Sequence, residues 1–393
     1  MNNILVCGGG SGGHVYPALA LLDKFKQHSQ VANIGFVGTK RNLESKIFRN
    51  RQDIEFFPVS SQHLRGGLKQ KLGGMRELAT GVYQAFGILK KFQPSLVIGT
   101  GGYSSIPMMF GALYRNIPTA IVEPNVKPGL ANRLLGLQVD HIFCHPRSYF
   151  DSNDRVSKTG VPLRSNLFET ESNEDLYQKW GLDPNKKTLL VLGGSLGAES
   201  LNQLALGIAK HLPLQVILSL GTQQSDTINH FQEKAKGLDN VNFFPYIKNM
   251  NEALALADVA VCRAGALTLA EMSARGIPAI TVPWEGSADS HQLHNARTHE
   301  AQDAGIVIRE ADLNLYTVLK TLKRMLKPKT FEEMQRASLA IGTHHRNAST
   351  RIVKEVEPYL YGQVPFYRDR RRRHERAGQG FLAAASPATR VQH

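Results

Sequence analysis

Cysteine is scarce in this sequence: its 393 residues include only Cys7, Cys144 and Cys262. An odd number at such wide spacing excludes a disulfide framework and a zinc site built on cysteine pairs. Each cysteine ends a short apolar run, so we expect three buried, reduced thiols at strand ends. Reduced thiols fit a cytoplasmic location.

Long apolar runs are also missing. No stretch reaches the roughly 18 uninterrupted apolar residues of a membrane-spanning helix. The most apolar region, residues 106–122, is interrupted by Arg115, Asn116 and two prolines. The first residues lead into a strand-like segment with no basic region and no cleavage site, so we predict no signal peptide.

Acidic residues are outnumbered, since 33 Asp and Glu stand against 47 Lys and Arg, for a net charge of +14. Residues 362–393 hold seven arginines against Asp369 and Glu375, and we predict a basic, disordered tail there. A basic protein of this size attracts anions. Composition alone leaves nucleic acid, anionic lipid and a phosphorylated substrate open.

Short β-branched runs alternate with helical patterns along the chain. The runs are 4–7, 34–37, 54–59, 96–99, 119–122 and 141–144, then 189–193, 216–219, 241–244, 259–262, 279–282 and 306–308. Continuous apolar strands separated by helices indicate parallel sheets covered on both faces. We therefore predict an α/β protein with two Rossmann-like domains that face each other across a cleft.

The domain plan follows from this repetition. We place the first domain at 1–163 and the second at 164–344, with a polar linker near 160–187. A helix over 345–361 is expected to pack back on the first domain. Ligands of open α/β sheets bind beyond the carboxyl ends of the strands, so the loops at those ends are expected to line the cleft.

Three glycine-rich loops follow predicted strands, at 8–13, 99–103 and 193–197. Glycines let backbone N–H groups approach a phosphate at a helix N-terminus. The first loop contains G-x-G-x-x-G, a weak sign of a dinucleotide site. The next strand ends without a carboxylate for a ribose, although Arg41 leaves an NADP site open. Three loops fit a donor diphosphate in one domain and an acceptor diphosphate in the other.

A fourth segment, residues 263–271, runs from a strand end through small residues into a helix. The N–H groups around Ala266 and Leu267 are suited to a nucleotide diphosphate. Glu271 lies about one turn further on, where a carboxylate can accept hydrogen bonds from ribose hydroxyls. The alternative for Glu271 is a structural carboxylate favoured by the helix dipole.

His14 directly follows the first loop and is expected to face the cleft. An imidazole near its ordinary pKa suits general base catalysis. The alternative is a histidine that caps the first helix or holds the loop.

Residues 68–92 mix apolar side chains with Lys69, Lys71, Arg76, Lys90 and Lys91. The pattern predicts a helix with basic ends that can dock on anionic lipid. The alternative is an ordinary helix packed on the sheet with solvated lysines.

Six segments, read in order, carry a family resemblance: 8–14 (GGGSGGH), 99–103 (GTGGY), 123–125 (EPN), 193–198 (GGSLGA), 263–268 (RAGALT) and 289–296 (DSHQLHNA). From about residue 2 to 361 the chain resembles the MurG family, the UDP-GlcNAc:lipid I N-acetylglucosaminyltransferases of bacterial peptidoglycan synthesis. The resemblance implies a GT-B fold, inversion at the anomeric carbon and no catalytic metal or other cofactor.

The resemblance also implies site residues, matched one at a time. His14 aligns with the candidate base, and Gln292, or its neighbour His291, with the contact to the sugar. The implied substrate contacts are Ser11, Gly12, Gly13, Asn125, Arg164, Ser195, Ile247, Ala266, Leu267, Thr268, Leu269, Ala270, Glu271 and Gln292.

The expected reaction moves GlcNAc from UDP-GlcNAc to the muramoyl 4-hydroxyl of lipid I, an undecaprenyl-diphosphate-linked acceptor. The expected location is the cytoplasmic face of the membrane, as a peripheral protein on an anionic surface, with no nucleic acid partner. Alternatives are a diacylglycerol glycosyltransferase, a UDP-GlcNAc 2-epimerase, an NADP oxidoreductase and a non-catalytic nucleotide-sugar binder.

Overall fold

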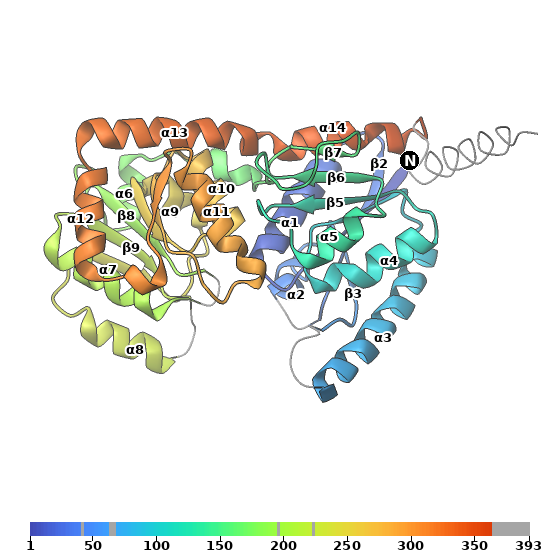
Figure 1. Cartoon of the computed structure of the whole chain (residues 1–393), viewed down its shortest axis with the longest axis horizontal. Helices are drawn as coiled ribbons and strands as arrows, with labels where there is room; N and C mark the ends of the chain where they lie inside the picture. Colours follow the sequence, from blue (N-terminus) through green and yellow to red (C-terminus); the bar gives the residue numbers. More distant parts are fainter. Residues whose placement is uncertain (41–42, 63–67, 195–196, 222–224, 364–393) are drawn as a thin grey trace, which may run out of the picture.

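Two parallel β-sheets, each covered by helices, form two lobes side by side (Figure 1). The structure is a computed structural model that describes residues 1–40, 43–62, 68–194, 197–221 and 225–363. The first sheet has the strand order β3-β2-β1-β4-β5-β6-β7, and the second has β10-β9-β8-β11-β12-β13. Every strand pair in the described residues is parallel.

The first lobe holds the elements from β1 to β7. Its strands are β1 (Asn2–Cys7), β2 (Val31–Gly38), β3 (Glu55–Pro58), β4 (Leu96–Gly99), β5 (Thr119–Glu123), β6 (His141–Cys144) and β7 (Val156–Ser157). Its helices are α1 (Gly12–Lys26), α2 (Leu43–Phe48), α3 (Leu68–Phe92), the 3₁₀ turn η1 (Tyr103–Ser105), α4 (Ile106–Tyr114) and α5 (Leu130–Gly136).

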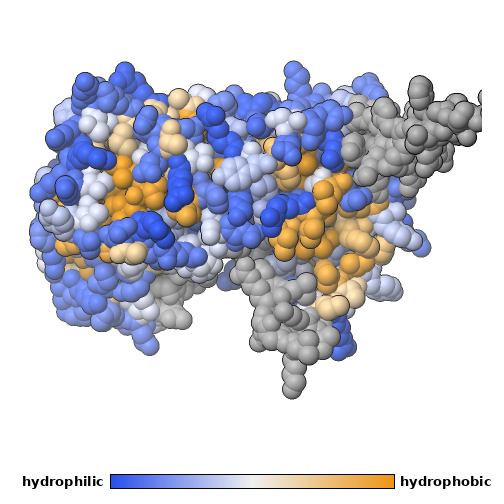
Figure 2. All heavy atoms as spheres, in the orientation of Figure 1, coloured by the Kyte–Doolittle hydropathy of each residue, from blue (hydrophilic) through white to orange (hydrophobic). Residues whose placement is uncertain are grey.

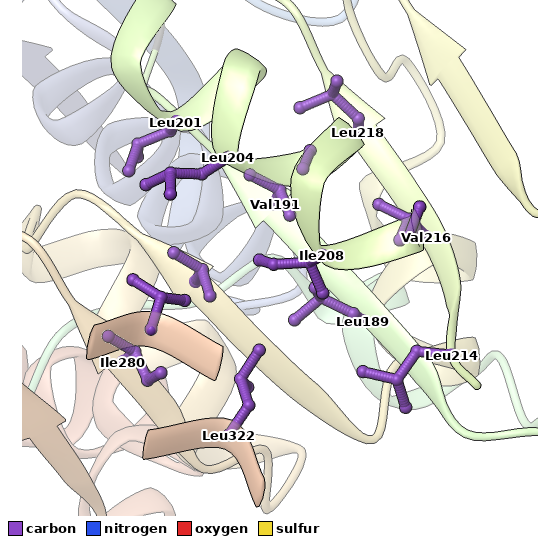
Figure 3. Close-up of a cluster of buried hydrophobic side chains, with 14 of the residues drawn as sticks. Leu189, Val191, Leu201, Leu204, Ile208, Leu214, Val216, Leu218, Ile280 and Leu322 are labelled. Atoms are coloured by element: carbon purple, nitrogen blue, oxygen red, sulfur yellow. The ribbon is translucent and has the colours of Figure 1, made fainter. Parts of the chain in front are cut away.

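The second lobe has its own core. Its strands are β8 (Thr188–Leu192), β9 (Gln215–Ser219), β10 (Val241–Phe244), β11 (Val259–Cys262), β12 (Ala279–Thr281) and β13 (Gly305–Val307). Its helices are η2 (Ser165–Phe168), α6 (Glu174–Lys179), α7 (Glu199–His211), α8 (Ser225–Lys234), α9 (Met250–Leu256), α10 (Ala266–Ala274), η3 (Ala288–Ser290), α11 (His291–Glu300), η4 (Glu310–Asp312) and α12 (Leu315–Met325). Branched aliphatic side chains from β8, β9, α7 and α12 interlock there (Figure 3).

The last two helices, α13 (Pro328–Arg346) and α14 (Ala348–Leu360), run along one side of both lobes (Figure 1). Apolar residues of α14, among them Ile352 and Val356, are fully buried in the first-lobe core with Phe25 of α1. The backbone carbonyl of Leu360 accepts a hydrogen bond from the side chain of Asn2, 3.1 Å away. The described chain therefore ends against the lobe in which it begins.

The chain crosses between the lobes at two places, near Gly160 and near His345, and these two segments are in contact. Gly160 has a φ of +93°, and a Cβ there would lie 2.3 Å from the backbone oxygen of His344. The next residue, Val161, donates its N–H to Nδ1 of His345 at 3.0 Å. Only glycine at position 160 allows the backbone to come this close to His344. The two segments that cross between the lobes therefore pack directly against each other.

The predicted α/β architecture with two parallel sheets is confirmed, and the predicted strands all form, with ends shifted by a few residues. Strand β7 was not predicted, because two residues at a sheet edge leave no apolar run. The linker predicted near 160–187 is too long, because the chain enters the second lobe directly after Gly160 and Leu167, Leu176 and Leu182 are buried in the core of that lobe.

Three further expectations have an outcome. The three cysteines are buried and free, as predicted. The helix predicted over 68–92 is present as α3, although the side chains of Lys69 and Lys71 are outside the described part. The basic tail is outside the described residues from 364 onward. Of the described helices, none has the length and apolarity needed to span a bilayer.

Candidate active site

The first glycine loop leads from β1 into α1. Gly9 has a φ of +149°, and a Cβ there would lie 2.4 Å from a carboxylate oxygen of Glu44. Ser11 is extended and makes no side-chain cap, so the first N–H groups of α1 have no side-chain partner from that residue. The predicted contacts Ser11, Gly12 and Gly13 are part-buried at this helix start.

His14 lies in the first turn of α1 and is held by the neighbouring loop. Its Nδ1 is 2.9 Å from the backbone carbonyl oxygen of Thr100. A carbonyl oxygen only accepts, so Nδ1 carries the proton and Nε2 is left unprotonated in the neutral ring. Burial lowers the pKa of His14 below its ordinary value, although the charge of Glu123 opposes this. The imidazole is therefore in the form that a general base requires.

The loop after β4 packs directly on this histidine. Gly101 and Gly102 have φ values of 98° and 80°. A Cβ on Gly101 would lie 2.8 Å from His14 Nδ1, and one on Gly102 would lie 2.3 Å from the backbone oxygen of Gly9. The glycines of both loops are thus required by close approach around the histidine.

In the second lobe, α10 begins after Gly265 with no side-chain cap and no acidic residue in its first turn. The first N–H groups of a helix lack backbone partners and carry partial positive charge. Ala266, Leu267 and Thr268 are part-buried at this end, whereas the predicted contacts Leu269 and Ala270 are buried in the core. The start of α10 is suited to a diphosphate.

Glu271, one turn into α10, forms an ion pair with Arg164. Their side chains are 8% and 18% exposed, and Arg164 Nη2 lies 2.7 Å from Glu271 Oε1. The guanidinium carbon also lies 4.5 Å from the ring centre of Tyr16 on α1. Arg164 Nε is buried and has no hydrogen-bond partner. Two residues predicted separately as substrate contacts therefore form one unit beside the first lobe.

Glu123, at the end of β5, is a buried carboxylate that sequence reasoning did not single out. Its Oε1 accepts from the backbone and side-chain amides of Asn125, both at 2.9 Å. Its Oε2 accepts from Gly129 N and Asn132 Nδ2, both at 3.0 Å. Four donors therefore hold this carboxylate in place, and its charge opposes the lowering of the His14 pKa by burial.

Asn295 on α11 joins the two lobes and was also missed. Its Oδ1 accepts from Val126 N at 3.0 Å. Its Nδ2 donates to Asn125 Oδ1 at 3.1 Å and to the backbone oxygen of Ala264 at 3.2 Å. Both Glu123 and Asn295 lie inside the motifs 123–125 and 289–296, which is the only signal that pointed to them.

The remaining predicted contacts are placed as follows. Gln292 Oε1 accepts from Trp284 N at 2.9 Å, and His291 is near enough to lower the pKa of His14. Ile247 is 3% exposed and packs in the second-lobe core. Ser195 is outside the described residues.

The described residues contain no cluster of three or more histidine, cysteine or carboxylate side chains arranged to hold a metal ion. Where α1 lies against α10, the structure instead places a histidine bonded to the Thr100 carbonyl, a helix start and a buried ion pair.

Comparisons with known proteins agree on one family. The models of the glycosyltransferase family 28 N-terminal and C-terminal domains match residues 4–144 and 188–355. A relative from Finegoldia magna is 36% identical over 337 residues, which cover 82% of this chain and 89% of the relative. It is described as UDP-N-acetylglucosamine–N-acetylmuramyl-(pentapeptide) pyrophosphoryl-undecaprenol N-acetylglucosamine transferase.

Solved structures share the fold. MurG from Acinetobacter baumannii aligns with a TM-score of 0.71 at 23% identity, over 91% of this chain and 99% of that one. A UDP-GlcNAc 2-epimerase from Neisseria meningitidis aligns with a TM-score of 0.64 at 12% identity, over 90% and 99%. The GT-B fold is therefore common to transferases and epimerases, so the fold alone does not distinguish these two reactions.

Proposed function

This chain belongs to the MurG family of glycosyltransferases, and from that premise we propose how its cleft performs the reaction. It is a hexosyltransferase that moves GlcNAc from UDP-GlcNAc to the muramoyl 4-hydroxyl of lipid I, giving lipid II for peptidoglycan. We assign residues 1–163 to the acceptor and 164–344 to the donor.

The observation that carries the mechanism is the bond from His14 Nδ1 to the Thr100 carbonyl. It orients the ring and leaves Nε2 to take the proton of the acceptor hydroxyl. The resulting oxygen attacks the anomeric carbon as the bond to the UDP oxygen breaks, which inverts the configuration. Holding the two substrates in this alignment and stabilising the departing charge provide most of the rate enhancement.

The departing diphosphate is proposed to rest on the N–H groups at the start of α10, with Arg164 beside it. Glu271 can keep Arg164 on Oε1 while ribose hydroxyls donate to its other lone pairs. The ion pair then aims the remaining donors of Arg164 at the diphosphate, and the unpartnered Nε supports this role.

The other contacts complete the donor site. The backbone at Ile247 is proposed to meet the uracil, and Gln292 or His291 to contact the sugar. Ser11, Gly12, Gly13, Asn125 and Ser195 remain proposed contacts around the transferred group. Glycosyl transfer requires an acceptor, whereas a UDP-GlcNAc 2-epimerase does not. The need for an acceptor therefore distinguishes the proposed transferase from an epimerase.

We propose that the first lobe docks on the membrane as a peripheral protein on the cytoplasmic face. Its exposed apolar side chains gather over α4 and α5, where Figure 2 shows a continuous hydrophobic patch. They include Phe110 (53% exposed), Tyr114 (74%), Leu130 (59%), Leu134 (60%) and Leu137 (64%). A contiguous apolar area of this kind marks an interaction surface. The neighbouring helix α3 contributes exposed lysines at its end.

A transfer assay tests the function. Labelled UDP-GlcNAc is incubated with a short-chain lipid I analogue, and with no acceptor as the control. We expect acceptor-dependent transfer of label with release of UDP. Isomerisation of UDP-GlcNAc in the control, without transfer in the complete reaction, would show an epimerase instead.

A further inference from the structure

The amide of Asn295 occupies an unusual position between the lobes. It is 4% exposed and lies on α11, one turn beyond the proposed sugar contacts. Two of its hydrogen bonds go to the first lobe, at Asn125 and Val126, and one goes to the second, at Ala264. A single side chain therefore connects the end of β5 with the segment that precedes α10.

The hydrogen bonds have only one consistent direction. Asn125 donates through Nδ2 to Glu123, so its Oδ1 must face Asn295. Asn295 must then present Nδ2 to Asn125 and to the carbonyl of Ala264, which leaves Oδ1 for the N–H of Val126. Reversing the Asn295 amide places like groups together at all three of its contacts, and reversing the Asn125 amide does so at two.

The hydrogen bonds run from Glu123 through Asn125 and Asn295 to Ala264, and each end of this chain of bonds lies next to a group with a role in the proposed reaction. At one end, burial lowers the pKa of His14 and the charge of Glu123 opposes this, while the Glu123 carboxylate also accepts hydrogen bonds from Asn125 and Gly129. At the other end, Ala264 is fully buried and is followed directly by the turn into α10. Among the described residues, no hydrogen bond joins Asn295 directly to His14 or to the first turn of α10.

We infer that Asn295 is a positioning residue for glycosyl transfer, which acts by holding the base side of the cleft in register with the diphosphate side. The inference rests on the proposed function, because register matters only where groups from both lobes act on one reacting carbon. A misplacement of about 1 Å between such groups can cost roughly a hundredfold in rate. Substrate binding to one lobe does not need this register.

The chain provides a matched control on the same helix. The hydroxyl of Tyr149, in the first lobe, lies 2.9 Å from His294 Nδ1 on α11. His294 is next to Asn295 in sequence, and its bond to Tyr149 also connects the two lobes. Within the described residues, however, neither of these two side chains forms a hydrogen bond to Glu123 or to α10. The variant Tyr149→Phe removes it with little change in shape.

The experiment compares the full-length wild type, Asn295→Ala and Tyr149→Phe. Calorimetric titration with UDP counts the folded donor sites, and kcat and donor KM are then measured per site with the lipid I analogue. We expect kcat of Asn295→Ala to fall about 10- to 100-fold, with the Kd for UDP within about threefold. Tyr149→Phe should stay within about twofold in both, as expected for a rim contact.

Several results would overturn the inference. A kcat for Asn295→Ala within threefold of wild type, an equal loss in Tyr149→Phe, or a parallel loss of UDP affinity each contradicts it. If Asn295→Ala does not fold, Asn295→Asp replaces it, because that side chain keeps the volume and the bond to Val126 while its carboxylate has no donor for Asn125. A wild type that binds UDP without transferring sugar overturns the proposed function, and this inference with it.

Discussion

Replacing His14 with alanine should abolish most of the transfer while leaving UDP binding nearly intact. The ring is the proposed proton acceptor, and loss of a general base costs about 10²–10⁴ in rate. The diphosphate is proposed to rest on α10 in the other lobe, so the Kd for UDP should change little. The control is His211→Ala, because His211 is exposed on α7 and its Nδ1 bonds the backbone oxygen of Gly207 in the same helix.

The pH dependence sharpens this prediction. A base must be neutral to work, and burial lowers the pKa of His14 from its ordinary value near 6.5. The acid limb of kcat/KM should therefore have its midpoint below pH 6.5, with a tenfold fall per pH unit beneath it. Glu123→Gln removes a charge that raises this pKa, so the limb should move to still lower pH.

Single-turnover transfer to the soluble acceptor analogue, measured from pH 5 to 8, is the assay. A well-folded His14→Ala variant that retains more than about a tenth of the wild-type rate would refute the assignment. An acid limb centred above pH 7 in the wild type would refute the electrostatic part of the reasoning.

Three other predictions follow from the same structure. Glu271→Ala should raise the donor KM about tenfold or more, since a hydrogen bond to a charged group contributes about 1.5–3 kcal/mol; unchanged UDP affinity in calorimetry would reduce Glu271 to a structural role. Phe110→Ser should weaken binding to anionic vesicles about tenfold in sedimentation, and added salt should weaken wild-type binding too; binding insensitive to both would contradict the docking surface. Burial lowers the pKa of His299 in the folded protein to about 4. As the pH falls, the imidazole is therefore protonated first in the unfolded chain, and the free energy of unfolding decreases between about pH 6.5 and pH 4. By pH 5 the free energy of unfolding should have decreased by about 2 kcal/mol. Urea unfolding of His299→Gln should not show this decrease, and an equal decrease in the variant would contradict the assignment to His299.

The sheets could be predicted from sequence because their strands are buried on both faces. Strand β8 reads Thr-Leu-Leu-Val-Leu and is buried at every residue, so its apolar run is continuous. The segment after Gly160 misled the prediction for the opposite reason. Its polar and acidic composition indicated a linker, but three leucines spaced along it pack into the second-lobe core.

The site was only partly predictable. The sequence points to His14 and to the start of α10, because the first follows a glycine-rich loop and the second a turn of small residues, each at a strand end. The pairing of Arg164 with Glu271 could not be found, because the residues are 107 positions apart and a sequence pattern does not show which distant segments of a lobe pack together. The same holds for Asn295, whose role depends on three backbone or side-chain groups from distant segments.

The return of α14 to the first lobe has a consequence for the order of synthesis. A ribosome completes β7 at Ser157, but the side chains that cover α1 arrive with α14, which ends at Leu360. At about 5–20 residues per second, the intervening stretch of roughly 200 residues takes about 10–40 s to translate. During that interval the nascent first lobe has an uncovered apolar face beside Phe25. Its maturation therefore waits until α14 has been translated, and a chain that terminates before α14 leaves this lobe incomplete even when all of its strands have been made.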